Sequence, residues 1–102
     1  MTDDTARALD LTPLVIEMTR EMLESEGLAL DTVDAETKLF GEGGVFDSMA
    51  IVSLIVAIEQ EIEARHGAFV ALADEKALSR SSSPYRTVAS LARYASESLE
   101  SA

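Results

Sequence analysis

The stretch GGVFDSMAIVSLIVAIEQEIEARHG, residues 43–67, decides the fold class of this chain. A glycine-rich loop leads into an Asp-Ser pair, and an apolar run begins directly after that pair. The apolar residues that recur at helical spacing are Ile51, Leu54, Ile55, Ile58 and Ile62. This spacing predicts a helix with one buried face. We expect the helix to begin near Ser48 and to end at about His66, where Gly67 can stop it.

The same helix carries a second apolar stripe, made of Met49, Val52 and Val56. At about 100° per residue, this stripe lies roughly 140° around the helix from the first one. No charged residue interrupts the helix before Glu59. Because one face cannot bury both stripes, the second is either covered by a neighbouring helix or exposed as a docking surface.

Two further segments show helical periodicity. In the first, LTPLVIEMTREMLESEG, Thr12 can cap the helix, Pro13 suits its first turn and Gly27 can end it. Its predicted buried face comprises Leu11, Leu14, Val15, Met18 and Met22. In the last segment, TVASLARYASESL, Thr87 can serve as the cap. The corresponding face there comprises Val88, Leu91, Ala92, Ala95 and Leu99.

The segments between these helices are less regular. Residues 28–47 lack helical periodicity, and we expect Val33, Leu39 and Phe40 to anchor them. Residues 73–78 have a brief helical pattern, followed by a serine-rich turn that closes at Pro84. The sequence therefore predicts an all-α fold, a small four-helix bundle with three main helices and a short third helix.

Composition limits the class of protein. The chain has 102 residues, which suits one small domain, and we expect residues 1–10 to be a flexible lead and residues 11–102 the folded domain. Nineteen acidic against eight basic side chains give a net charge of −11, which disfavours binding to nucleic acid and to anionic membranes. No secretory signal and no apolar run of membrane-spanning length is found, so we expect a cytoplasmic protein without membrane insertion.

Catalysis by the serine of the Asp-Ser pair is disfavoured. The single histidine, His66, lies near the far end of the helix that Ser48 begins, roughly 27 Å away at the usual helical rise. The stretch GEGGVFDS, residues 41–48, lacks the lysine of a phosphate-binding P-loop. The carboxylates of residues 31–44 lack the spacing of a calcium-binding EF-hand. Without cysteine, no thiol nucleophile is present either. We therefore expect neither a serine hydrolase nor a thiol enzyme, and no resident metal.

The segment GGVFDSMAIVSLIVAIEQEIE resembles the modification site and second helix of acyl carrier proteins. In that family a serine within an Asp-Ser-Leu type motif takes a 4'-phosphopantetheine arm. The motif stands here as Asp47, Ser48 and Met49. The resemblance extends over about residues 11–100 and includes KLFGEGG before the motif and SPYRTVASLARYASESL near the end.

The resemblance implies specific roles. Ser48 would carry the arm, which a phosphopantetheinyl transferase attaches from coenzyme A with a divalent ion, and Asp47 would help to engage that transferase and its metal. The arm's thiol would hold an acyl or aminoacyl group as a thioester, loaded by a ligase and passed to a downstream transferase or synthase. The implied partner-binding residues are Met49, Val52, Val56 and Glu59. The implied core or acyl-pocket residues are Leu54, Ile55, Ile58 and Ile62.

One difference from the family narrows the expected role. Carriers of bacterial fatty acid synthesis usually bear acidic residues in the first turns of this helix, where this chain has Ala50 and Ser53. We therefore expect a stand-alone, monomeric carrier in a specialised biosynthetic pathway, whose partners dock through apolar contacts.

Two alternatives stay open from the sequence. An aminoacyl or peptidyl carrier would have the same protein features as an acyl carrier, because the cargo contacts the arm more than the protein. An unmodified helical adaptor would use Met49, Val52 and Val56 to bind a partner helix, with Ser48 or Asp47 as a simple helix cap.

Overall fold

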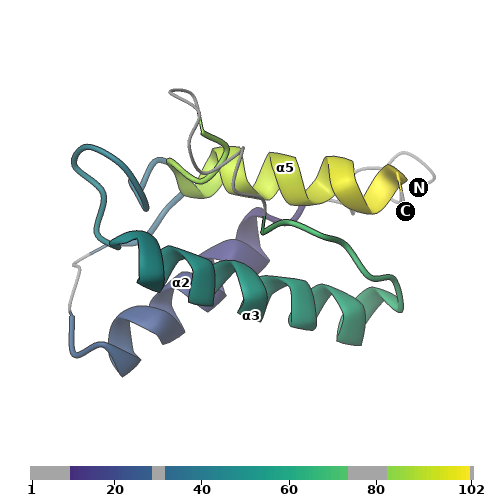
Figure 1. Cartoon of the computed structure of the whole chain (residues 1–102), viewed down its shortest axis with the longest axis horizontal. Coiled ribbons are helices and arrows are strands. Elements are labelled where there is room, and N and C mark those ends of the chain that lie inside the picture. The colour runs from purple at the N-terminus through teal and green to yellow at the C-terminus, as the bar shows by residue number, and fades with distance from the viewer. Residues whose placement is uncertain (1–9, 29–31, 74–82, 102) are drawn as a thin grey trace.

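The computed structural model describes residues 10–28, 32–73 and 83–101, which contain three α-helices (Figure 1). Helix α2 spans Thr12–Ser25, α3 spans Ser48–His66 and α5 spans Val88–Ser101. The extended pairing found in the described residues is a single antiparallel bridge between Lys38 and Thr87. The fold is thus small and all-α, as predicted. Residues 74–78 of the predicted short helix lie outside the described residues.

The start of α2 differs from the prediction. The Asp10 carboxylate oxygen Oδ1 accepts hydrogen bonds from the Thr12 hydroxyl at 2.7 Å and from the Thr12 backbone N–H at 3.0 Å. Thr12 is the first helical residue and not the cap, because the Leu11 carbonyl already accepts the Val15 N–H at 2.9 Å and the Thr12 hydroxyl donates to Asp10. The bond from the hydroxyl, and then that from the N–H, lowers the pKa of Asp10 below its usual value.

The buried face of α2 is also rotated from the predicted one. Its buried residues are Leu14, Val15, Thr19 and Leu23. Met18 and Met22, which we expected in the core, are half-buried at its edge. Thr19 is fully buried, and its hydroxyl has no hydrogen-bond partner in the structure. The apolar periodicity alone therefore located the helix but not the centre of its buried face.

Helix α3 has the predicted bounds. Asp47 is its N-cap, and Oδ1 of its carboxylate accepts a hydrogen bond of 2.8 Å from the Ala50 N–H. Gly67 ends the helix with φ +70°, a left-handed conformation that glycine adopts without strain. The residues of the first stripe, all with no exposed surface, are Ile51, Leu54, Ile55, Ile58 and Ile62. The prediction of this core face is confirmed.

The start of α5 is joined to the long loop that precedes α3. Thr87 caps the helix as predicted, with its hydroxyl accepting from the Ser90 N–H at 3.1 Å. The N–H groups of Val88 and Ala89 donate to the carbonyls of Thr37 and Ala35 at 3.1 and 2.8 Å. Since the first N–H groups of a helix have no partner within it, these loop carbonyls satisfy them and fix the loop in place.

The three helices do not all touch one another. Helix α2 packs against both α3 and α5, whereas α3 and α5 share no close backbone contact. The segment that follows α3 runs back through the space between α3 and α5 (Figure 1). Its side chains Val70 and Leu72 are buried there, as is Tyr85 just before α5. None of the helices in the described residues is both long and apolar enough to cross a membrane.

Candidate functional site

A tight loop precedes α3 and supports its first residue. Gly44 allows this loop to close, because a Cβ atom at its position would lie 2.7 Å from the Phe40 nitrogen and 2.8 Å from the Leu39 carbonyl carbon and oxygen. Only a residue without a side chain fits so close to another backbone. The N–H groups of Val45 and Phe46 donate to the carbonyls of Lys38 and Leu39 at 3.2 and 2.9 Å. The loop therefore doubles back on itself directly before Asp47.

Two apolar side chains anchor this loop in the core. Leu39 has no exposed surface, and Phe46 is 5% exposed. The sequence predicted Leu39 as an anchor but not Phe46, whose place directly before the Asp-Ser pair was the available signal. Phe40, the other expected anchor, is only half-buried, whereas Val33 is buried as expected. The residues on which the site depends are thus tied to the core on both sides of the glycines.

Ser48 lies at the exposed N-terminus of α3. It is the first helical residue, and its hydroxyl has no hydrogen-bond partner among the described residues. The N-cap is Asp47, which is exposed and uses Oδ1 for the Ala50 N–H. The capping role that could have explained Ser48 in structural terms therefore belongs to Asp47. What Ser48 offers is an accessible hydroxyl at the positive end of a helix dipole.

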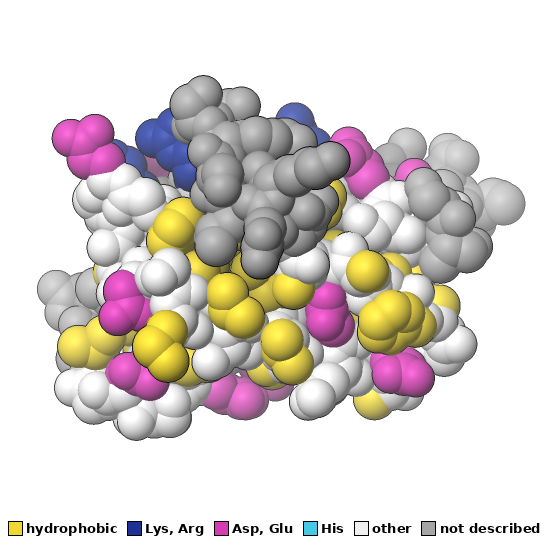
Figure 2. Space-filling view, viewed as in Figure 1, with side chains coloured by type: hydrophobic (Ala, Val, Ile, Leu, Met, Phe, Trp, Pro, Cys, Tyr) yellow, Lys and Arg dark blue, Asp and Glu magenta, His cyan; other side chains and the backbone are white. Residues whose placement is uncertain are grey.

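The second apolar stripe of α3 is exposed, so no described helix covers it. Met49, Val52 and Val56 are 81%, 39% and 37% exposed, and Met49 directly follows Ser48. Figure 2 shows hydrophobic side chains gathered on the face that α3 presents, with acidic side chains among them. Exposed apolar side chains grouped in this way are typical of interaction surfaces. The sequence had left a covered and an exposed stripe as alternatives, and the structure has the exposed one.

Glu59 has a structural contact that the sequence analysis missed. Its Oε2 atom accepts hydrogen bonds from the backbone N–H of Leu72, at 2.5 Å, and of Ala73, at 3.0 Å. The side chain is half-buried, so this carboxylate ties the segment after α3 to the helix. Contact between Glu59 and a partner protein stays a prediction. The available signal was that Glu59 is the first charge in an otherwise uncharged helix.

The four remaining predicted residues, Leu54, Ile55, Ile58 and Ile62, lie in the core. They point away from the exposed stripe and toward the other helices. Their role in sheltering a cargo stays a prediction. His66 is exposed at the other end of α3, so the structure places no histidine near Ser48.

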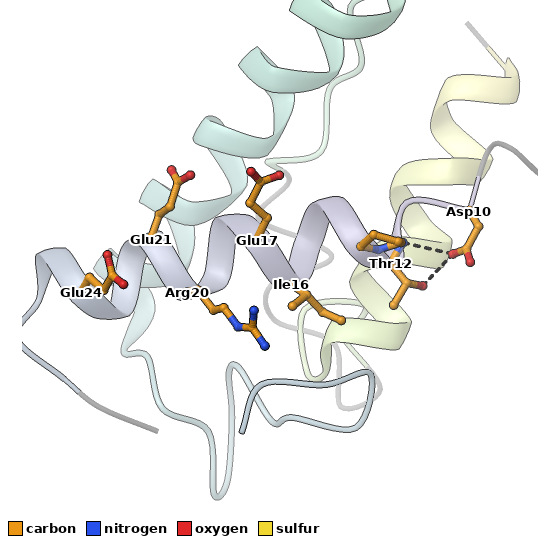
Figure 3. A pocket seen from close by; sticks show the side chains of 8 residues that line it. Asp10, Thr12, Ile16, Glu17, Arg20, Glu21 and Glu24 are labelled. Atoms are coloured by element: carbon orange, nitrogen blue, oxygen red, sulfur yellow. Dashed lines mark hydrogen bonds between the residues drawn. The ribbon is translucent and has the colours of Figure 1, made fainter. Parts of the chain in front are cut away.

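Two surface hollows lie away from Ser48. One, of about 480 Å³, lies along α2, and the residues that line it include Glu17, Arg20, Glu21 and Glu24 (Figure 3). Another, of about 290 Å³, lies between the start of α2 and α5. Neither includes a residue of the α3 N-terminus. Over the described residues, no three His, Asp or Glu side chains are grouped as a metal site would require.

No protein-family model, curated protein or solved structure matches this chain. Its function must therefore be argued from its own residues. Among the described residues, the site comprises an unpaired, exposed serine hydroxyl at a helix N-terminus, a tight loop before it and an exposed apolar stripe beside it. Such an arrangement can present a covalently attached group together with a surface that other proteins contact.

Proposed function

We propose that this chain is a carrier protein that holds an acyl or aminoacyl group on a 4'-phosphopantetheine arm attached to Ser48. The observation that carries the proposal is the position of Ser48, exposed and without a hydrogen-bond partner among the described residues, while Asp47 does the capping. A serine that served only as a helix cap would accept a backbone N–H bond. The resemblance of residues 43–63 to the modification site of acyl carrier proteins supports the same assignment.

The helix terminus suits the attached group. A phosphodiester on the Ser48 oxygen carries one negative charge, and unpaired backbone N–H groups at a helix N-terminus stabilise such an anion. The Asp47 carboxylate is the one charged side chain next to Ser48 in sequence, and no charged residue follows in α3 before Glu59. Since Gly44 and the buried Phe46 hold the loop, the arm would leave from a defined point on the surface.

The neighbouring residues then have supporting roles. Asp47 engages the phosphopantetheinyl transferase and its metal, and Met49, Val52 and Val56 contact the transferase, the loading ligase and the downstream enzyme. Met49 is exposed, unbranched and polarisable, so it can adapt to several partners. On this proposal the chain is a monomeric carrier of the cytoplasm that serves a specialised pathway and is not an enzyme. The proposed fold is a four-helix bundle, completed by a short helix before α5.

Intact-protein mass spectrometry tests the attachment. The unmodified protein is incubated with a broad-specificity phosphopantetheinyl transferase, coenzyme A and magnesium, and we expect a mass gain of one arm. Ser48→Ala should gain nothing, whereas Ser53→Ala should gain as much as the parent, because Ser53 is also an exposed serine of α3. Circular dichroism checks that all three fold. A folded parent protein without any mass gain, or an arm on Ser48→Ala, would contradict the proposal.

A second candidate function is an unmodified adaptor. The observation that favours it is the exposed stripe, since 81% exposure of Met49 suits a partner helix as well as an enzyme. This function requires the stripe and not the serine. In the adaptor case Ser48→Ala keeps the protein's function in its host. Met49→Ser combined with Val52→Ser abolishes that function, because the partner helix no longer binds.

A further inference from the structure

The segment after α3, residues 67–73, crosses the molecule as a strap. It leaves the end of α3 at Gly67 and runs back between α3 and α5 (Figure 1). Val70 is 3% exposed and Leu72 has no exposed surface, so the strap contributes two side chains to the core. Because α3 and α5 share no close backbone contact, these side chains fill space between the two helices.

The main chain of the strap is held in an unusual way. Among the described residues, no backbone-to-backbone hydrogen bond involves residues 68–73. Three bonds from side chains replace them. Glu59 accepts from the N–H groups of Leu72 and Ala73, and the Tyr85 hydroxyl donates to the Leu72 carbonyl. Leu72 is therefore held at both its N–H and its C=O, by side chains from α3 and from the lead into α5.

The two residues that hold Leu72 differ in their surroundings. Tyr85 is 1% exposed, and its ring meets the Tyr94 ring edge-on with centroids 6.1 Å apart, so α5 fixes its position. Glu59 is only half-buried, and a single oxygen of its carboxylate serves both N–H groups. Water can compete for a half-buried carboxylate far better than for a buried hydroxyl. Glu59 is thus the weaker of the two attachments.

We propose that Glu59 and Tyr85 form a latch on the strap, and that release of Glu59 opens the core between α3 and α5 without unfolding the helices. Segments with few backbone hydrogen bonds open at lower cost than helices do. Opening withdraws Val70 and Leu72 and exposes apolar side chains of α3 and α5. The latch goes beyond the proposed carrier function and does not depend on it. If a thioester is carried, the latch determines whether an apolar chain can enter the core.

Amide hydrogen exchange followed by nuclear magnetic resonance tests the latch in the unmodified protein. Glu59→Ala is compared with Glu63→Ala, which removes the same charge from an exposed side chain one turn later in α3. We expect the amides of Leu72 and Ala73 to exchange about tenfold faster in Glu59→Ala than in Glu63→Ala, because they lose a charged acceptor. The Ile58 amide, inside α3, should exchange at the same rate in both variants.

Two outcomes would overturn the latch. One is exchange of Leu72 and Ala73 within twofold of the Glu63→Ala control. The other is an equal acceleration at Ile58, which would mean that the whole molecule had been destabilised. If Glu59→Ala fails to fold, Tyr85→Phe tests the other half of the latch, because it removes the hydroxyl and keeps the ring. An exchange rate of the Leu72 amide equal to that in the parent protein would then overturn the latch.

A dye that fluoresces on apolar surfaces tests whether the core opens. Its fluorescence should increase severalfold with Glu59→Ala and stay at the parent level with Glu63→Ala. An unchanged signal would overturn the exposure of the core. Both experiments use protein without an arm. Their failure would therefore leave the assignment of Ser48 untouched, and a negative result in the mass measurement would leave the latch untouched.

Discussion

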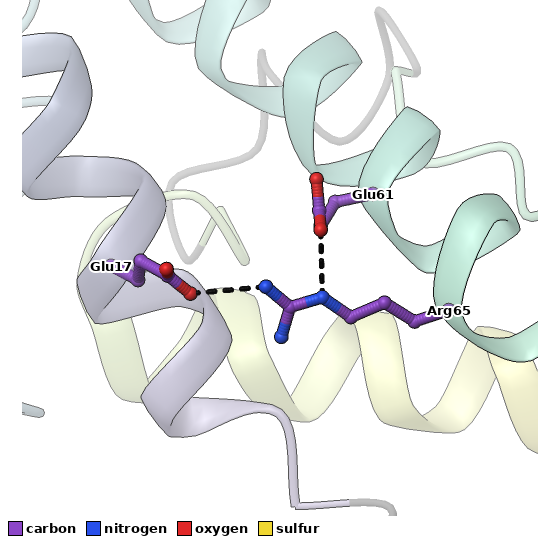
Figure 4. Close-up of polar contacts among 3 residues, drawn as sticks. All are labelled: Glu17, Glu61 and Arg65. Atoms are coloured by element: carbon purple, nitrogen blue, oxygen red, sulfur yellow. Dashed lines mark hydrogen bonds and ion pairs between the residues drawn. The ribbon is translucent and has the colours of Figure 1, made fainter.

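The two halves of α3 differ in how their side chains are used. In residues 58–66 three charged groups bind within the chain: Glu59 holds the strap, and Arg65 pairs with Glu61 at 2.7 Å and with Glu17 of α2 at 3.1 Å (Figure 4). Residues 48–57 carry no charge and expose a hydroxyl and an apolar stripe. Both halves pack into the core, but only the first half leaves its hydroxyl and its second apolar stripe available to other molecules.

The largest effect is expected from Gly44→Ala, which lies in the loop that supports the start of α3. A Cβ atom there would lie 2.7 Å from backbone, so the loop must shift, and we expect a loss of about 3 kcal/mol in the free energy of unfolding. Urea denaturation measures it. Gly41→Ala is the control, since its φ of +92° is unfavourable for alanine but no atom lies within 4 Å of the added Cβ. Gly41→Ala should lower the free energy of unfolding by only about 1 kcal/mol. Equal losses in Gly44→Ala and Gly41→Ala would show that close packing at Gly44 does not support the site.

A smaller loss is expected at the N-cap of α3. Asp47→Ala removes the acceptor of the Ala50 N–H and should lower the free energy of unfolding by about 1 kcal/mol. Asp47→Asn should cost only a few tenths of that, because asparagine caps equally well. The comparison separates two roles: if Asp47 also engages a transferase, Asp47→Asn slows attachment of the arm while the stability is kept. Equal attachment rates in Asp47→Asn and the parent protein would leave Asp47 as a cap alone.

The hydroxyls of Ser48 and Thr19 both lack a hydrogen-bond partner among the described residues, but they differ in exposure. Ser48 is exposed, so water satisfies it, whereas Thr19 is fully buried and its hydroxyl has no partner. Thr19→Val should therefore increase the free energy of unfolding by up to about 1 kcal/mol, since it removes an unsatisfied buried hydroxyl and keeps the shape. Ser48→Ala should leave stability nearly unchanged. Thermal denaturation of both variants checks this, and a destabilised Thr19→Val would mean that the hydroxyl finds a partner in solution.

The smallest effect is expected at the ion pairs that join α3 to α2. Hydrogen bonds from Arg65 to Glu61 and Glu17 raise the pKa of the guanidinium, so it stays charged at any ordinary pH. The group is exposed, and exposed pairs contribute little. Arg65→Gln should lower the melting temperature less than Asp47→Ala does. The loss that Arg65→Gln causes relative to the parent protein should vanish in about 1 M salt. Arg93→Gln, an exposed arginine of α5, is the control; an effect of Arg65→Gln that persisted in salt would contradict a screened surface pair.

Much of the helical structure could be predicted from local patterns. The bounds of α3, its capping by Asp47 or Ser48, its stop at Gly67 and the Thr87 cap of α5 all follow from residue types at adjacent positions. The predictions that were wrong concern α2, where residues outside the local apolar pattern determine the cap and the buried face. Thr12 is not the cap, because its hydroxyl donates to Asp10 and the helix has Leu11 as its N-cap. The α2 face centres on Thr19 because the helix packs on two others at once.

By itself the sequence determined that α3 is a helix with two apolar stripes, that its first half is uncharged and that Ser48 begins it. These properties depend on spacing along the chain, and helical geometry converts spacing into faces. Only the tertiary structure decided which stripe is exposed, that Gly44 must lie against Leu39 and Phe40, and that Glu59 and Tyr85 meet at Leu72. Such contacts join residues up to 13 positions apart through an irregular segment, whose path follows from packing between helices and not from periodicity.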